Sequence, residues 1–319
     1  MNYRIVPFDR SLREPAWALF VASYLQAVEG APALPLRAAQ DQNWIYSLLS
    51  EAAPGLGVAA FLGDQLVGFM LAGQPFTFKT QSTSAIHPFM HSAVSTDKSR
   101  IYQLLYCALA EQLIAGGINL HIIAHFTNDA AVLQTIYRLG FGAVVEERIR
   151  DLEPVASTNH VEVLSEYDPI KIDELIREHA RYYRESPIFI LHEFDHTTVP
   201  VESMGGRHSG NALFVFRDRG QAAAYIIVGR RADSHEGLLL QDTNTAHVLT
   251  AYVKPEARRR GVGTVLLNTA ITWAKQNGFD RLFVEHETAN ISGGRFWSKH
   301  FTSYLLISMR YIDPSVIRV

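Results

Sequence analysis

Cysteine is almost missing from this sequence of 319 residues, in which Cys107 is the only one. A single cysteine can form neither an intrachain disulfide nor a zinc site of several thiolates, and this scarcity suits a reducing compartment. Cys107 lies among apolar neighbours, so we expect it to be a buried packing thiol and not a nucleophile. These neighbours are Leu104, Leu105, Ala108 and Leu109.

Long apolar runs and long basic tracts are also absent. No charge-free apolar run approaches the roughly 18 residues that a membrane span needs, and residues 1–6 lack the apolar stretch of a signal peptide. The formal net charge is -3, and the only basic run of note is residues 258–260. Nucleic-acid binding depends on many phosphate contacts. We therefore expect a cytoplasmic protein with neither a nucleic-acid nor a membrane partner.

The order of predicted elements occurs twice along the chain, whose length suits about two domains. A polar stretch at residues 151–159 contains Pro154 and reads as a connector. We predict a first domain over residues 1–154, a linker over 155–160 and a second domain over 161–319. Each half begins with a short strand, a helix and two alternating apolar strands. In the first half these lie at residues 3–7, 13–29 and 57–71. In the second half they lie at residues 161–164, 170–184 and 212–228.

The match is closer toward the end of each half, where a helix, a glycine stop, a strand, a helix and a last strand follow in that order. The helices predicted over 99–115 and 263–277 each carry a stripe of apolar or small residues and end at glycine. The final strands are predicted over 142–147 and 304–311. A period of about 160 residues indicates duplication of a whole domain and not a solenoid.

A basic glycine loop joins the strand over 248–253 to the second long helix. It reads Arg258-Arg259-Arg260-Gly261-Val262-Gly263-Thr264. Glycines allow close backbone approach, the first N–H groups of a helix lack intrahelical partners, and arginine adds charge, so this loop suits a pyrophosphate. The dinucleotide fingerprint is excluded because Leu266 stands at the third glycine position, and the chain has no Gly-Lys-Ser/Thr.

The sequence around this loop resembles motif A of the GNAT superfamily of N-acetyltransferases. The resemblance rests on Ala251-Tyr252-Val253, Pro255-Glu256, Arg258, Gly261-Val262-Gly263-Thr264 and Leu266-Leu267. Downstream, Leu282-Phe283-Val284, Asn290 and residues 293–301 resemble motif B of the same family. The resemblance covers nearly all of residues 160–312.

The resemblance implies an α+β fold of two tandem GNAT domains, each a mixed, mostly antiparallel sheet flanked by helices, with two central parallel strands that splay apart. In outline this arrangement resembles that of mycothiol synthases. The cosubstrate implied is acetyl-coenzyme A, with no metal, and the acceptor is a small-molecule amine or a protein lysine that attacks directly. Tyr252 and Val253 would pair with the pantetheine arm, Arg258 through Thr264 would hold the pyrophosphate, and Asn290 would contact the coenzyme.

The second half departs from the family at the position where a tyrosine often serves as the acid for the departing thiolate, because Trp297 stands there. We expect Trp297 to pack in the core, and leave Ser298 and Tyr304 as alternative acids. For the general base that an ammonium acceptor requires, Glu285 is the first candidate, because it shares a strand face with Glu287. His247 and Asp242 are further candidates.

The first half lacks the glycine loop, since no glycine occurs between residues 74 and 115. Residues 121–125, 128–131 and 137–141 still resemble motif B, with the family-type tyrosine at Tyr137. We therefore expect a degenerate GNAT domain in which Tyr137 is a core residue. A stretch rich in histidine and aromatic residues would flank the acceptor site, without the spacing of a metal site. It contains Phe189, His192, Phe194, His196 and His208. An acyl-coenzyme A sensor and a protein–protein adaptor remain alternatives.

Overall fold

The computed structural model describes residues 2–50, 52–156, 163–166, 172–190, 210–230 and 237–315. The chain forms two compact units. Unit 1 comprises Met1–Glu146 together with Ser303–Val319, and unit 2 comprises Glu147–Thr302. No helix within the described residues is long and apolar enough to cross a membrane.

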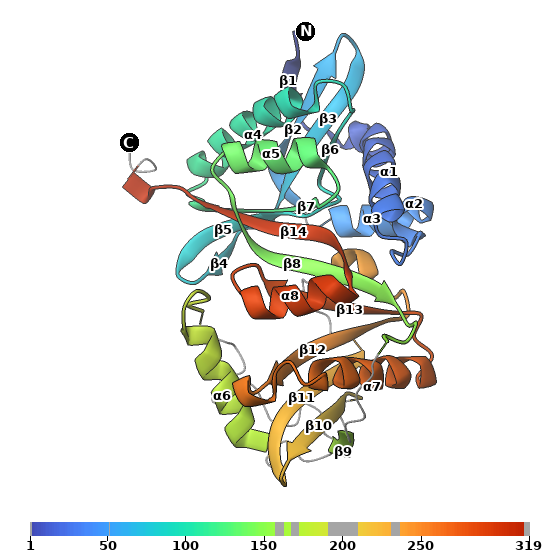
Figure 1. Cartoon of the computed structure of the whole chain (residues 1–319). Coiled ribbons are helices and arrows are strands. Elements are labelled where there is room, and N and C mark those ends of the chain that lie inside the picture. Colours follow the sequence, from blue (N-terminus) through green and yellow to red (C-terminus); the bar gives the residue numbers. More distant parts are fainter. Residues whose placement is uncertain are drawn as a thin grey trace. The chain divides into compact units, whose positions relative to one another are not determined.

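Unit 1 contains two sheets and five helices among its described residues (Figure 1). One sheet has the order β1-β2-β3-β6 with antiparallel neighbours, and the other contains β4-β5-β7-β14, in which only β5 and β7 are parallel. The elements are β1 (Arg4–Pro7), α1 (Arg13–Gly30), α2 (Arg37–Gln40), α3 (Gln42–Leu49), β2 (Ala52–Leu62), β3 (Gln65–Gly73), β4 (Phe76–Phe78), β5 (Gln81–Ile86), β6 (His91–Ala93), α4 (Lys98–Ala115), β7 (Leu120–Phe126), α5 (Ala130–Arg138), β8 (Gly142–Asp151) and β14 (Thr302–Tyr311).

The last strand of the chain belongs to unit 1, although the sequence pattern assigns it to the second half. Antiparallel pairing of β14 with β7 places Ile307 opposite Ala124, and the side chain of Thr127 donates to the carbonyl of Ser303. Strand β8 runs from unit 1 into unit 2, which begins at Glu147. Local pattern identifies a strand but not its partner, because pairing is decided by contacts distant in sequence. The domain boundary at residues 155–160 stays a prediction.

Unit 2 is built on five strands in the order β13-β12-β11-β10-β9, all antiparallel neighbours except β12 and β13. Helix α7 packs on one face of this sheet against Ala246, Val248 and Leu282, and α6 packs on the other against Tyr225 and Ile227. The elements are β9 (Val163–Glu166), α6 (Asp173–Arg184), β10 (Ala212–Asp218), β11 (Gln221–Arg230), β12 (Thr245–Val253), α7 (Val262–Gln276), β13 (Arg281–Glu287) and α8 (Ile291–His300).

The predicted fold class is confirmed, and so are the buried stripes of the two long helices. Leu105 and Leu109 of α4, and Leu266 and Ala270 of α7, are fully buried. The burial predicted for Cys107 is wrong, because that residue is exposed. Each helical residue turns by about 100°, so Cys107, two residues after Leu105, faces away from the buried stripe.

The core position predicted for Tyr137 is also wrong. Its side chain is 75% exposed, whereas the preceding residue Ile136 is buried. Helix α5 begins after Asp129, which caps it by accepting from the N–H of Val132. This register turns Val132 and Ile136 inward, and Tyr137 lies on the outer face as a consequence.

Candidate active site

The parallel strands β12 and β13 of unit 2 pair only near their beginnings. Register pairs are found at Thr245, Ala246 and His247 of β12, opposite residues 281–283. Beyond His247 both strands continue without further pairing to one another, to Val253 and Glu287. Two neighbouring parallel strands that splay apart are the arrangement that the motif A resemblance implies.

A β-bulge lies in β12 where the strands begin to diverge. Thr250 lies opposite Ile227 of β11 and Val248 lies opposite Val228, so Leu249 is the extra residue. A bulge leaves its extra residue unpaired and bends the strand. The bulge therefore gives a physical reason for the turning of β12 away from β13.

The loop that follows β12 has the backbone of an anion site. After a 3-10 turn at Pro255–Ala257, Arg259 and Gly261 both have positive φ, 61° and 78°. Gly261 is the N-cap of α7 and supplies no side-chain cap, and the first helical bond runs from the N–H of Val265 to Gly261. The preceding N–H groups, including those of Gly263 and Thr264, thus have no intrahelical acceptor, and the helix dipole adds positive charge there.

Arg258 is bound to the strand that precedes it. Its Nε donates to the carbonyl of Val253 at 2.9 Å, and its guanidinium lies over the ring of Tyr182 at 5.3 Å and that of Tyr252 at 5.9 Å. These contacts fix the direction in which the chain leaves β12. In this structure Arg258 shapes the loop through its own protein contacts.

The other two arginines differ in their surroundings. Arg260 donates to Asp218 at the end of β10 at 2.5 Å, and the hydrogen bond from Arg260 is the main reason why the pKa of Asp218 is lowered. Arg259 is exposed, and no partner for its side chain is found among the described residues. Arg259 is thus the arginine of the loop with a side chain that can meet an anion without breaking a protein contact.

Packing is a second reason, besides access to the backbone, why residue 263 is a glycine. A Cβ at this position would lie 3.2 Å from Cε2 of Phe296 on α8. Phe296 in turn contacts Trp297, which is buried in the core against α7, as predicted. The second glycine of the loop therefore allows α7 and α8 to approach one another closely.

Helix α6 contributes a group of side chains that motif reasoning missed. The hydroxyl of Tyr252 donates to Glu178 at 3.0 Å, and Glu178 also pairs with Lys254 at 3.1 Å. His179 stacks on Tyr252 with ring centroids 4.7 Å apart, and burial is the main cause that raises the pKa of Tyr252. The side chain of Tyr252 therefore faces α6, and only its backbone remains for the role that the resemblance implies.

Asn290 caps α8 at the end of β13. Its Oδ1 accepts from the N–H of Gly293 at 2.9 Å and from the hydroxyl of Tyr182 at 2.9 Å. A Cβ at Gly293 would lie 2.8 Å from the Asn290 amide nitrogen, which explains the glycine. The side chain of Asn290 also bonds the hydroxyl of Tyr183, so α6 holds this residue through two tyrosines.

The carboxylates of β13 face the α6 side of the sheet. Leu282 and Val284 point into the core under α7, so Glu285 and Glu287, which alternate with them, point to the opposite face. Both are half-buried. Tyr183 of α6 donates to Glu287, and burial first and this carboxylate second raise the pKa of the Tyr183 hydroxyl.

The remaining sequence-based candidates lie elsewhere. His247 is buried at the last paired position of β12 and packs on Phe283, which places it at the closed end of the splayed strands. Asp242 is exposed ahead of β12. Ser298 is exposed and donates to the carbonyl of Arg295, and Tyr304 is buried in unit 1.

The segment predicted to flank the acceptor site is only partly described. Phe189 is 73% exposed at the end of the described α6 region. His192, Phe194, His196 and His208 lie outside the described residues. Within the part of the chain that the structure describes, no three or more His, Cys, Asp or Glu residues are grouped as a metal site.

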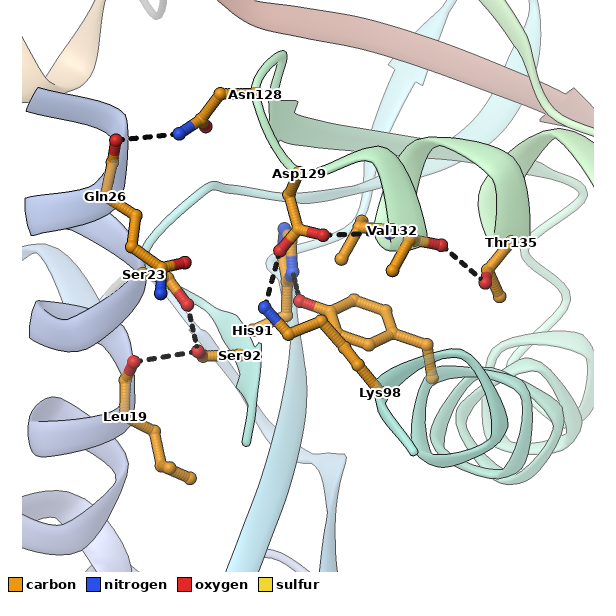
Figure 2. A network of polar contacts seen from close by, with 12 residues as sticks. Leu19, Ser23, Gln26, His91, Ser92, Lys98, Asn128, Asp129, Val132 and Thr135 are labelled. Carbon is orange, nitrogen blue, oxygen red and sulfur yellow. Dashed lines mark hydrogen bonds and ion pairs between the residues drawn. The ribbon is translucent and has the colours of Figure 1, made fainter. Parts of the chain in front are cut away.

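The corresponding place in unit 1 is filled by its own side chains (Figure 2). Lys98, the first residue of α4, donates to Asp129, the N-cap of α5, at 2.6 Å. His91 of β6 binds the carbonyl of Ala124 in β7 through Nε2 and the hydroxyl of Tyr102 through Nδ1, each at 2.8 Å. Burial lowers the pKa of His91 to about 4, so the ring is neutral at pH 7. The space between β6 and β7 is thereby bridged from within.

Comparison with known proteins finds a similarity for most of unit 2. Residues 172–301 match the sequence model of the acetyltransferase (GNAT) family. Streptothricin acetyltransferase A of Bacillus subtilis (strain 168) is 48% identical over 48 residues, which span 15% of this chain and 28% of that relative, less than a third of its length. Residues 172–301 are thus similar in sequence to the GNAT acetyltransferase family.

Two solved structures share the fold of the chain. A GCN5-related N-acetyltransferase from Sphaerobacter thermophilus is 12% identical with a TM-score of 0.53, covering 98% of this chain and 96% of that one. The glucosamine N-acetyltransferase region of a fungal multi-domain GH3 beta-N-acetylglucosaminidase is 16% identical with a TM-score of 0.53, covering 97% of this chain and 38% of that one. At these identities the likeness concerns the fold alone, and it agrees with the predicted α+β class.

Proposed function

We propose that this protein is an N-acetyltransferase that moves the acetyl group of acetyl-coenzyme A to a primary amine, with its active site in unit 2. The observation that carries the proposal is the pair of splayed strands β12 and β13, followed by the glycine loop and the uncapped N-terminus of α7. Unit 1 has a related order of elements, but His91 and the Lys98–Asp129 pair fill the matching place. We therefore interpret the chain as a tandem protein with a degenerate first domain.

The coenzyme would lie with its pyrophosphate against the backbone of residues 258–264. Converging N–H groups and the dipole of α7 favour an anion there, and Arg259 adds charge from the exposed side. The edge of β12 at Tyr252 and Val253 is not paired with β13, so its backbone groups are open to the amides of the pantetheine arm. Asn290, which follows the other strand, would contact the coenzyme.

The reaction needs no covalent enzyme intermediate. The neutral amine nitrogen attacks the thioester carbonyl carbon, and the carbon–sulfur bond breaks. Coenzyme A leaves as the thiolate, and the nitrogen loses its second proton to this thiolate or to water as the amide forms. A backbone N–H at the Leu249 bulge would donate to the negative charge that develops on the carbonyl oxygen. An ammonium acceptor must first lose a proton, for which Glu285 is the proposed base, with Glu287 beside it on the same face.

Two matched variants test the base. Glu285→Gln is expected to lower kcat/KM by about 10²–10⁴-fold and to flatten its dependence on pH at the acid side, while leaving the Kd of coenzyme A unchanged. Glu287→Gln serves as the comparison from the same strand face. An unchanged rate across pH in Glu285→Gln would remove Glu285 as the base, and a large loss confined to Glu287→Gln would assign that role to Glu287.

The acceptor is proposed to be a small-molecule amine, because the matched relative is named for such a substrate; a protein lysine is the second possibility to assay. Purified protein is incubated with labelled acetyl-coenzyme A and a panel of small amines and lysine peptides, and coenzyme A binding is measured by thermal shift. Transfer to an amine supports the enzyme. Tight binding without transfer to any acceptor would indicate a sensor, and no binding would indicate an adaptor.

A further inference from the structure

Tyr182 of α6 is the side chain that connects the diverging ends of β12 and β13. Its ring lies under the guanidinium of Arg258, which follows β12, at 5.3 Å, and 6.1 Å from the ring of Tyr252. Its hydroxyl donates at 2.9 Å to Oδ1 of Asn290, which follows β13. One half-buried residue thus contacts the chain at the far, unpaired ends of both splayed strands.

The hydrogen bond between Tyr182 and Asn290 is separate from the contacts that hold α6 on the sheet. Leu175 and Ile176 are buried against the sheet. Glu178 and His179 bind the neighbouring strands through Tyr252 and through the hydroxyl of Tyr225. These contacts lie one to two helical turns before Tyr182, so the Tyr182 side chain can change rotamer without α6 leaving the sheet.

Resting on the proposed function, we infer that Tyr182 is a gate residue of the coenzyme site. Its hydrogen bond to Asn290 spans the opening between β12 and β13 through which the pantetheine arm must pass. Binding of the coenzyme must break that hydrogen bond. The steric reason is that an arm lying between the two strands and a hydroxyl bonded across the same two strand ends compete for one place. Breaking the bond also releases Oδ1 of Asn290 from one of its two donors.

Removing the Tyr182 hydroxyl should strengthen coenzyme A binding, whereas removing a hydroxyl that contacts the coenzyme would weaken it. Tyr182→Phe keeps the ring under Arg258 and removes only the hydroxyl that bonds Asn290. If the bond opposes binding, its removal makes coenzyme A bind more tightly, by about three- to tenfold for one hydrogen bond. A tyrosine whose hydroxyl instead contacts the bound coenzyme would give weaker binding on the same substitution.

The test is calorimetric titration of the full chain with coenzyme A for the wild type, Tyr182→Phe and the control Tyr137→Phe, which removes an exposed hydroxyl in unit 1. We expect a three- to tenfold lower Kd in Tyr182→Phe alone, with a faster association rate by stopped flow. Equal or weaker binding in Tyr182→Phe, with normal binding by the wild type, would overturn the gate and leave the proposed function intact. Absence of binding in all three proteins would overturn both.

Discussion

Two helix N-termini, one in each unit, have opposite electrostatic arrangements. In unit 1 the capping residue of α5 is Asp129, a carboxylate that also binds Lys98 at the start of α4. In unit 2 the capping residue of α8 is Asn290, which is neutral, and α7 begins at Gly261 without any side-chain cap. A carboxylate of the chain itself therefore caps the start of α5, whereas no side chain caps the start of α7.

The difference between the two units has an electrostatic reason. Partial positive charge at a helix start favours any nearby anion, whether it belongs to a ligand or to the protein. Asp129 supplies that anion from within unit 1, and His91 bridges the strands where a pantetheine arm would lie. Unit 2 has a neutral cap and a glycine loop, and under the proposed function a bound coenzyme would supply the anion.

The largest expected effect concerns the buried histidines of unit 1. Burial lowers the pKa of His91, His121 and His125 to about 4, so the folded state keeps them neutral while the unfolded chain protonates them below pH 6.5. Their contribution to stability is present above pH 6.5 and is lost as the pH falls toward 4. From pH 7 to pH 5 we expect the free energy of unfolding of unit 1 to fall by about 3–5 kcal/mol.

Urea unfolding followed by tryptophan fluorescence checks this expectation. Trp17 and Trp44 report on unit 1 when Trp273 and Trp297 of unit 2 are changed to Phe. A His91→Gln variant should show a smaller loss between pH 7 and pH 5, since one titrating group is removed. A midpoint that does not move between these pH values would contradict the assignment of neutral, buried imidazoles.

Asp129→Asn should destabilise unit 1 by about 3 kcal/mol, because it leaves the ammonium of Lys98 buried without a carboxylate. Asparagine remains a good N-cap, so the loss measures the ion pair and not the cap. The double change Lys98→Met with Asp129→Asn is the control, and we expect it to recover much of the loss. We expect no coenzyme A binding to unit 1 in either variant, since His91 still bridges its strands.

Gly261→Val should weaken coenzyme A binding by about 100-fold or more, because a β-branched residue resists φ of +78° and its side chain enters the loop. Gly278→Val is a matched control at the other end of the same helix. Its φ is +77°, and a Cβ there meets nothing within 4 Å. Both variants should lose similar stability by thermal unfolding, and only the first should lose binding by calorimetry. Equal losses of binding would refute the loop as the anion site.

Asn290→Asp tests directly whether the charge of the N-cap distinguishes the two units, since it gives α8 the kind of capping residue that α5 has. Asp and Asn cap equally well, so the melting temperature should stay nearly constant. The added carboxylate repels the phosphates of the coenzyme, and we expect its Kd to rise about tenfold at low salt and less at high salt. Binding that is unchanged at low ionic strength would show that the charge of this cap is irrelevant.

Much of unit 2 could be predicted because its signals are local. The glycine loop, the helix stripe that contains Leu266 and Ala270, and the buried Trp297 all follow from neighbouring residues. The exposure of Cys107 and Tyr137 was missed because apolar neighbours in sequence do not share a helix face. The α6 residues were missed because the contact of Tyr182 with Asn290 joins positions 108 residues apart, and no local pattern carries such information.

The sequence by itself determined the glycine loop and the neutral Asn290 after it, because backbone freedom and charge are properties of individual residues, and the α+β class followed from the motif resemblance. Only the tertiary structure decided that β14 pairs in unit 1, that Arg258 and Arg260 bind their own unit, and that Tyr182 connects the ends of β12 and β13. These outcomes depend on contacts between segments that are distant in sequence. Such contacts form only when helices and sheets pack together and bury their apolar faces.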